Sequence, residues 1–315
     1  PKAEEVSSYV QDANSLESQI GRGFPGWAQY WGEQPMTVGP VYVGALVCFL
    51  FVLGLFFVRG PLKWALLLST MLSLFFAWGK NTMPITDFFI DFLPMYSKFR
   101  TVSSALVIAE FTMPLLAMLC LAKILQKPDE LWQTRSGRIG LGVATACTAG
   151  LCLLLALVPS LAGSFVASAE EEGLAYLSQY FPQFRAGVVE VRQAILSGDA
   201  LRSFFIIAIS IVLIWLYVRR RIKPWVLCSV LAVICLFDMW SVNKRYLNDD
   251  SFSDPVAQQQ GFEKTTADEM ILHDKGLSHR VLNLSQGNPF NETSNRTSYW
   301  HKSIGGYNAA KLHRY

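Results

Sequence analysis

Hydrophobic residues gather in six long segments of the chain, separated by shorter polar or basic stretches. These segments cover residues 41–58, 64–78, 102–122, 139–161, 204–218 and 224–242. Each approaches the roughly 20 residues that an α-helix needs to cross about 30 Å of hydrocarbon, although 64–78 and 204–218 are short. Apolar runs without alternation exclude a transmembrane barrel. The pattern therefore predicts a mainly α-helical, polytopic membrane bundle of six helices over residues 41–242.

Basic residues in the connecting loops predict the orientation of this bundle. The loops after the first, third and fifth segments are rich in arginine and lysine, and they share one side once the segments alternate. By the positive-inside rule that side is the cytoplasm. Residues 1–40, 79–101, 162–203 and everything after residue 242 are then expected on the outer side. The separation is not complete, since Lys98 and Arg100 lie in an outer loop.

Composition supports a membrane location and excludes several other classes. Of 315 residues, 52% are hydrophobic and 16% are charged, which is too apolar for a soluble domain of ordinary make-up. The net charge is only +3 and the basic residues cluster in the inner loops, so we expect no nucleic-acid partner. All six cysteines fall inside apolar segments, and no Cys/His spacing suits a transition metal. Because the chain begins at Pro1 and stops within a segment that looks folded, we expect an internal fragment.

The outer loop 79–101 contains a predicted amphipathic helix over residues 84–96. Asp87 and Asp91 lie four residues apart and share its polar face. Its apolar residues recur at helical spacing, so we expect the helix to lie flat in the outer interface of the membrane. These apolar residues are Ile85, Phe88, Phe89 and Phe92.

Two cations follow this helix, Lys98 and Arg100, just before the third apolar segment. Two carboxylates and two cations at a lipid boundary suit acid–base chemistry, a divalent cation, or the phosphate of an anionic lipid held by Arg100. A solvated polar face with basic residues touching headgroups gives the same pattern. The residues alone leave both interpretations open.

Ionisable residues inside the apolar segments are further candidates. Glu110 lies in the middle third of the third segment, with Pro114 one turn later. A carboxyl group at that depth must face protein, water or a partner, which makes it a functional candidate. It also has a structural interpretation, as a protonated group bonded to a neighbouring helix or to backbone that Pro114 frees. Asp238 is predicted closer to water, and a structural role is favoured there.

Aromatic residues with glycine and proline mark the first outer segment. Tyr30 and Trp31 stand in the run GFPGWAQYWGEQP at residues 23–35. Their ring faces could stack on a sugar, which would make the loop a carbohydrate platform, or the rings could belong to an interfacial aromatic belt.

The remaining outer segments predict short helices and the start of a domain. Ser168 and Glu171 have the spacing of a capping box, so a helix should begin there, and a second short helix is expected over 186–196, ending at Gly198. After residue 242, a linker over 249–255 precedes a predicted helix at 265–275 and a strand at 279–284. Residues 243–315 are therefore predicted to form the beginning of an extracytoplasmic α/β domain.

Several strings taken together resemble one protein family. They are YWGEQP at residues 30–35, GPVYVG at 39–44, MYSKFRT at 95–101, RVLNL at 280–284 and YWHKSIGGY at 299–307. In this order they look like the YfhO-like family of bacterial polytopic membrane proteins, and the resemblance spans nearly the whole chain.

This resemblance implies a GT-C-type membrane glycosyltransferase. Such a protein would move a sugar from a polyprenyl-phosphate carrier to an envelope glycopolymer or lipid on the outer face of the bacterial cytoplasmic membrane. Its main catalytic carboxylate is expected upstream of this fragment, which leaves Asp87 and Asp91 as the candidates within it. The expected partners are membrane lipids, the carrier-linked sugar and an envelope glycan acceptor.

Substrate-binding candidates and two other function classes complete the expectations. We expect Lys98 and Arg100 to bind the lipid phosphate, and we add Glu110, Tyr30 and Trp31 as substrate-binding candidates. Whether a divalent cation is a cofactor is left open by the sequence. A lipid or solute transporter would also use Glu110, but it should carry an inverted internal repeat, which the six segments lack. A non-catalytic envelope assembly protein would need only the bundle and the outer domain.

Overall fold

The computed structural model describes residues 41–94, 96, 102–180, 182, 184–249, 252, 254–256, 262–274, 279–285 and 296–304. The chain divides into two compact units, Pro1–Tyr246 and Leu247–Tyr315. Most of the described residues are helical, and none of them forms a strand.

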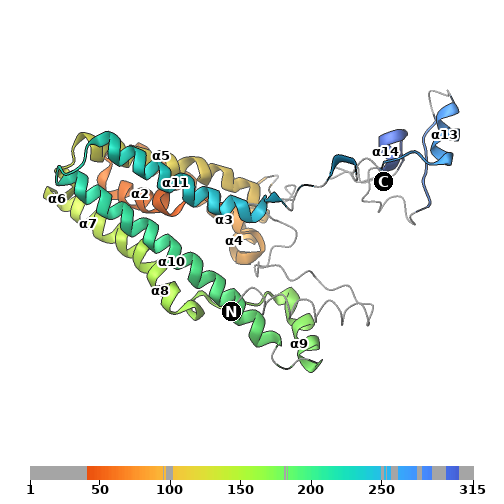
Figure 1. The fold of residues 1–315 in the computed structure, drawn as a ribbon, viewed down its shortest axis with the longest axis horizontal. Helices are drawn as coiled ribbons and strands as arrows, with labels where there is room; N and C mark the ends of the chain where they lie inside the picture. The colour runs from red at the N-terminus through yellow and green to blue at the C-terminus, as the bar shows by residue number, and fades with distance from the viewer. Residues whose placement is uncertain are drawn as a thin grey trace. The chain divides into compact units, whose positions relative to one another are not determined.

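The described part of the first unit is a bundle of helices (Figure 1). A π-helical turn, Ala146–Gly150, joins the helix Arg135–Thr145 to the helix Leu151–Leu157 without a break. The helices are α2 (Ala45–Phe57), α3 (Leu62–Trp78), α4 (Met83–Phe92), α5 (Leu106–Gln126), α6 (Glu130–Gln133), α7 (Arg135–Thr145), α8 (Leu151–Leu157), α9 (Glu171–Tyr180), α10 (Phe184–Val218) and α11 (Pro224–Tyr246).

Four of these helical stretches are long and apolar enough to cross a membrane. They are Val102–Gln126, Arg135–Leu157, Arg185–Val218 and Pro224–Tyr246, and they contain most or all of the third to sixth predicted segments. The bent pair α3–α4 makes a fifth candidate only if it is counted as one span. Large apolar side chains cover the outside of the bundle; Phe111 and Leu236, for example, are 68% and 67% exposed. Outward apolar surface of this kind suits a lipid environment, so the coarse prediction of a helical membrane protein holds, whereas six spans are not confirmed.

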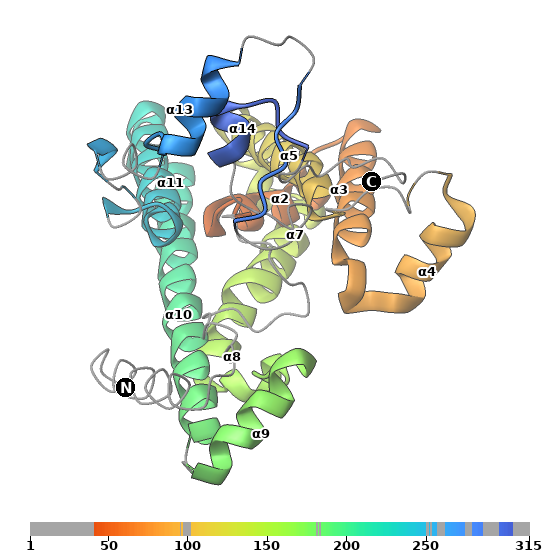
Figure 2. The same cartoon turned by 90° about the vertical axis from the view of Figure 1, so that its right-hand side faces the viewer.

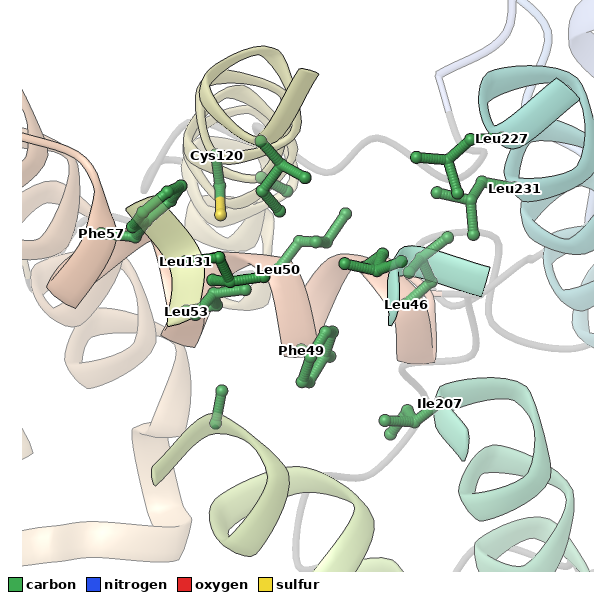
Figure 3. Close-up of a cluster of buried hydrophobic side chains, with 14 of the residues drawn as sticks. Leu46, Phe49, Leu50, Leu53, Phe57, Cys120, Leu131, Ile207, Leu227 and Leu231 are labelled. Carbon is green, nitrogen blue, oxygen red and sulfur yellow. The ribbon is translucent and has the colours of Figure 1, made fainter. Parts of the chain in front are cut away.

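The first predicted segment, 41–58, forms a shorter helix than expected. Helix α2 has only 13 residues, about 20 Å of helix, because Gly44 adopts a positive φ of 96° before it and Val58 is extended after it. It packs against α5, α7 and α10, and it contributes Phe49, Leu53 and other side chains to the main core (Figure 3). A helix surrounded by protein on these sides does not need a full lipid-spanning length.

The fifth predicted segment belongs to a much longer helix. Helix α10 runs unbroken from Phe184 to Val218, so the expected separate helix over 186–196 with an end at Gly198 is wrong (Figure 2). One glycine costs a helix only about 1 kcal/mol. Tertiary contacts on both sides of Gly198 offset this cost: Arg192 pairs with Glu170 before it, and Arg202 donates to the Ser241 hydroxyl after it. Helix α9, in contrast, begins at Glu171 after a 3₁₀ turn over Ser168–Glu170, so a helix does start in the predicted stretch.

The second predicted segment ends in a sharp bend. The axes of α3 and α4 differ by 101°, and Gly79 at the bend has a φ of 47°. The Thr86 hydroxyl donates to the Gly79 carbonyl at 2.6 Å, and the Phe89 ring packs edge-on against Phe76 with ring centroids 4.6 Å apart. Helix α4 therefore turns away from α3 at a steep angle (Figure 2).

Small and hydroxyl side chains join α5 to α3. The hydroxyls of Thr70 and Thr112 lie 2.7 Å apart, and the Ser73 hydroxyl donates to the Ala105 carbonyl and accepts from the Ala109 amide. Such contacts allow close approach of membrane helices. They also fix the rotation of α5 about its axis, because Ala109 and Thr112 must face α3.

The described part of the second unit contains two short helices, α13 (Thr266–His273) and α14 (Arg296–Trp300). Helix α13 agrees with the predicted helix over 265–275, and Thr265 and Asp268 form a capping box at its start. The predicted strand over 279–284 contributes only an isolated parallel bridge between Val281 and Ser303. An α/β domain is thus not confirmed by the described residues.

Candidate functional site

The candidate carboxylates Asp87 and Asp91 are both exposed on α4. The predicted apolar face of this helix is divided in the structure. Phe89 packs inward, while Phe88 and Phe92 are 56% and 73% exposed and lie against each other with ring centroids 5.0 Å apart. A helix at a steep angle to a membrane span, with exposed phenylalanines beside exposed carboxylates, has the surface of an interfacial helix.

Four of the other predicted site residues lie outside the described residues: Tyr30, Trp31, Lys98 and Arg100. The carbohydrate platform and the phosphate-binding cations therefore stay predictions. Among the described residues, no group of three His, Cys, Asp or Glu side chains could hold a metal ion.

Glu110 lies on the side of α5 that faces away from α3. Its side chain is exposed, and it has no hydrogen bond or ion pair among the residues that the structure describes. A charged side chain at the centre of a membrane helix costs about 2.5–3.5 kcal/mol. No described contact joins Glu110 to Asp87 or Asp91, so the structure does not bring these candidates into one site.

Asp238 forms a cluster that the sequence analysis missed. It was expected near water, but it is fully buried on α11. Its carboxylate accepts from the Tyr42 hydroxyl at 2.9 and 3.0 Å and from the Ala45 amide at 2.9 Å. The Ala45 N–H belongs to the first turn of α2, where backbone donors lack helical partners and the helix dipole favours an anion. Asp238 thus caps α2 from another helix.

Arginines on two helices extend this cluster. Arg202 of α10 lies 3.5 Å from the Asp238 carboxylate and donates to the Ser241 hydroxyl at 2.9 Å, while its buried Nε atom has no partner among the described residues. Arg245 of α11 pairs with Asp199 of α10. Two arginines and two aspartates balance in charge, so this cluster ties α2, α10 and α11 together and does not leave a free cation for a phosphate.

Asp238 and Arg202 gave a weak signal in the sequence. Each is an ionisable residue in or beside an apolar segment, and such residues usually pair with one another. Their 36-residue separation along the chain gives no periodicity that would identify the pair, and Tyr42 looks like an ordinary interfacial aromatic residue.

A cavity of about 290 Å³ lies in the second unit. Its polar lining includes Asp268, His301 and Arg296. His301 is buried and its Nε2 lies 2.8 Å from the Asp268 carboxylate. Hydrogen bonds from the amide and hydroxyl of Thr265 lower the pKa of Asp268 to about 2. Because these bonds complete a helix cap, Asp268 serves the local fold here.

Comparison of the chain with protein-family models, with curated proteins and with solved structures finds no match. The fold and the exposed apolar surface define the class of the protein: it is mainly helical, and its apolar helices have the character of membrane spans.

Proposed function

We propose that the protein is a membrane glycosyltransferase of the GT-C type, which transfers a sugar from a polyprenyl-phosphate carrier to an envelope glycopolymer or lipid on the outer face of the bacterial cytoplasmic membrane. The proposal starts from the resemblance to the YfhO-like family. The feature of the structure that supports it best is α4, a short helix at 101° to α3 with Asp87 and Asp91 exposed beside Phe88 and Phe92.

The chemistry of sugar transfer needs groups at the height of the lipid headgroups. The bond between the anomeric carbon and the carrier phosphate breaks as an acceptor hydroxyl attacks, so negative charge grows on the departing phosphate and the hydroxyl loses its proton. A cation can stabilise the phosphate, and a carboxylate can accept the proton. A carrier with a long apolar tail keeps its phosphate at the membrane surface, which is where an interfacial helix lies.

In this scheme, the candidate residues other than Glu110 have the following roles. Lys98 and Arg100, which follow α4 in the chain, would hold the phosphate. Asp87 or Asp91 would accept the proton, or would bind a divalent cation beside the phosphate. Tyr30 and Trp31 would stack on the sugar or the acceptor.

The test follows label from a radiolabelled polyprenyl-phosphate sugar into envelope glycopolymer, with the protein in lipid nanodiscs. Arg100→Ala should abolish transfer while membrane insertion stays intact. Asp87→Asn or Asp91→Asn should lower the rate, because the amide cannot accept the proton, and the variant that does so identifies the base.

A matched control is Glu172→Gln, which removes an exposed carboxylate from α9, another predicted outer segment. It should leave the rate unchanged. Retained transfer in Arg100→Ala would remove the phosphate-binding assignment. If folded protein transferred no sugar from any donor, a role in transport or in non-catalytic envelope assembly would replace the proposal.

A further inference from the structure

The turn between α10 and α11 carries a run of exposed cations. Arg219, Arg220, Arg221 and Lys223 lie between these two candidate membrane spans, and all four side chains are exposed. Arg220 pairs with Asp129 at 3.1 Å, which joins the turn to the loop after α5. The other three cations have no ion pair among the residues that the structure describes.

The carboxylates near this turn are already paired. Hydrogen bonds from α5 to α2 and from α10 to α5 bring two other connections, 59–63 and 123–138, to the same end of the bundle. These connections add six cations and only two carboxylates, Asp129 and Glu130. Asp129 pairs with Arg220, and Glu130 pairs with two lysines of its own connection. This end of the bundle therefore has a surplus of positive charge that favours the binding of an anion.

Exposed apolar side chains continue from this turn along both helices. On each helix they recur at helical spacing and so form one stripe. The opposite sides of the two helices contribute Ile214 and Leu227 to the core, so the stripes face outward. The exposed side chains are Phe205, Ile209, Val212 and Trp215 on α10, and Trp225, Val233, Leu236 and Trp240 on α11.

Tryptophans stand where the stripes meet the cations. Trp215 and Trp225 are 42% and 66% exposed, at the last turn of α10 and the first turn of α11. The guanidinium of Arg219 lies 5.5 Å from the centre of the Trp215 ring. Exposed tryptophans prefer the level of the lipid headgroups, so the cations beside them lie at the height of the lipid phosphates.

We propose that the α10–α11 turn and the two outward stripes bind an anionic phospholipid. Arg219, Arg221 and Lys223 hold the phosphate of its headgroup, and its acyl chains pack on the stripes. A soluble anion would leave the apolar side chains uncovered, and a lipid without net charge would leave the cations unbalanced. Only an amphiphile with a negative head matches both features of the surface. This site does not depend on the proposed sugar transfer.

The experiment measures how strongly the full protein prefers phosphatidylglycerol to phosphatidylcholine when the two lipids have identical acyl chains. The protein is placed in micelles that contain both lipids, and native mass spectrometry counts the lipids that it retains. The native protein should retain phosphatidylglycerol preferentially. A cation near the membrane surface contributes about 1 kcal/mol to the attraction of an anionic lipid, or about fivefold in binding. Arg221→Gln should therefore lower the preference about fivefold, and Arg221→Gln with Lys223→Gln about 25-fold.

Two controls distinguish a lipid site from general attraction. Arg138→Gln removes an exposed cation at the same end of the bundle but on α7, and it should change the preference by less than about twofold. Glycerol phosphate, a soluble molecule with the same phosphate chemistry and no acyl chains, should not displace the lipid at equal concentration. All the substituted side chains are exposed, and thermal unfolding in phosphatidylcholine should give the native Tm for each variant.

Three results would overturn the inference. Equal retention of the two lipids by the native protein would remove the site. An equal loss of preference in Arg138→Gln and Arg221→Gln would show that the whole basic end attracts anionic lipid without a site at the turn. Displacement by glycerol phosphate would show a phosphate site to which the stripes contribute nothing.

Discussion

Replacement of Asp238 by alanine should destabilise the first unit more than any nearby change to a lipid-facing residue. The native carboxylate is fully buried and accepts hydrogen bonds from the Ala45 amide and the Tyr42 hydroxyl, with Arg202 3.5 Å away. Without it, one backbone donor and one hydroxyl lose their acceptor, and Arg202 keeps only the Ser241 hydroxyl and the more distant Asp199 carboxylate, 3.8 Å away. Removing one partner of a buried ion pair costs about 3–5 kcal/mol, because the remaining charge is left buried and unpaired.

This cost converts to a measurable shift in melting temperature. A loss of 1 kcal/mol lowers Tm by roughly 2–4 °C for a unit of this size, so Asp238→Ala should lower Tm by roughly 6–20 °C. Thermal unfolding of the nanodisc-embedded protein, followed by tryptophan fluorescence, measures the shift. Asp238→Asn keeps one acceptor oxygen and loses the charge, so its cost should be smaller, roughly 1–3 kcal/mol.

Control variants distinguish the effect of the Asp238 contacts from the effect of any substitution in α11. Phe237 is the neighbour of Asp238 and is 65% exposed, so Phe237→Leu should change the free energy of unfolding by less than about 0.5 kcal/mol. Tyr42→Phe should cost about 1.5–3 kcal/mol in the native chain and much less in Asp238→Ala, because the hydroxyl then has no carboxylate to donate to. The capping role of Asp238 would be refuted if Asp238→Ala had the same Tm as the native protein. It would also be refuted if the free-energy costs of Tyr42→Phe and Asp238→Ala simply added in the double variant.

Three further predictions concern other contacts. A Cβ on Gly140 would lie 2.6 Å from the Cβ of Phe56, whereas a Cβ on Gly142 would meet open space. Gly140→Ala should therefore destabilise the protein by about 1–3 kcal/mol, and Gly142→Ala should stabilise it by up to about 1 kcal/mol. Thermal unfolding measures both changes. Arg192 is 2% exposed and pairs with Glu170 at 2.8 and 3.1 Å, so Glu170→Gln should loosen α9. Relative to the native protein, the amide hydrogen exchange of the variant should become faster in α9 than in α11. An equal change in the two helices would contradict this prediction. The low pKa of Asp268 means that its carboxylate stabilises the fold fully above pH 3.8, the ordinary value, and loses this effect as the pH falls through about 2. The NMR chemical shift of the Asp268 carboxyl carbon should therefore titrate with a midpoint near 2. Thr265→Ala should raise that midpoint toward 3.8.

The apolar segments predicted most of the helices but not their ends. The third and sixth segments became α5 and α11 because uninterrupted apolar residues have no stable alternative to a helix in lipid. Gly198 misled the prediction for α10, since a local helix-breaking tendency of about 1 kcal/mol is smaller than the tertiary contacts that flank it. For α2, the converse held: Gly44, with a positive φ, delayed the start of the helix to Ala45, although the apolar run begins at residue 41.

Apolar run length and charge within an apolar run are local properties, so the order of the residues was enough to predict a helical membrane protein and to select Asp87, Asp91 and Glu110 as candidates. Which ionisable residues are paired became clear only from the contacts between helices. Asp238 looked close to water and proved to be buried between Tyr42, Ala45 and Arg202. For Glu110 the sequence left protein, water or a partner as alternatives, and its side chain is exposed on α5. The physical reason is that the rotation of a helix about its own axis depends on contacts with other helices, such as those of α5 with α3, which lie far away in the sequence.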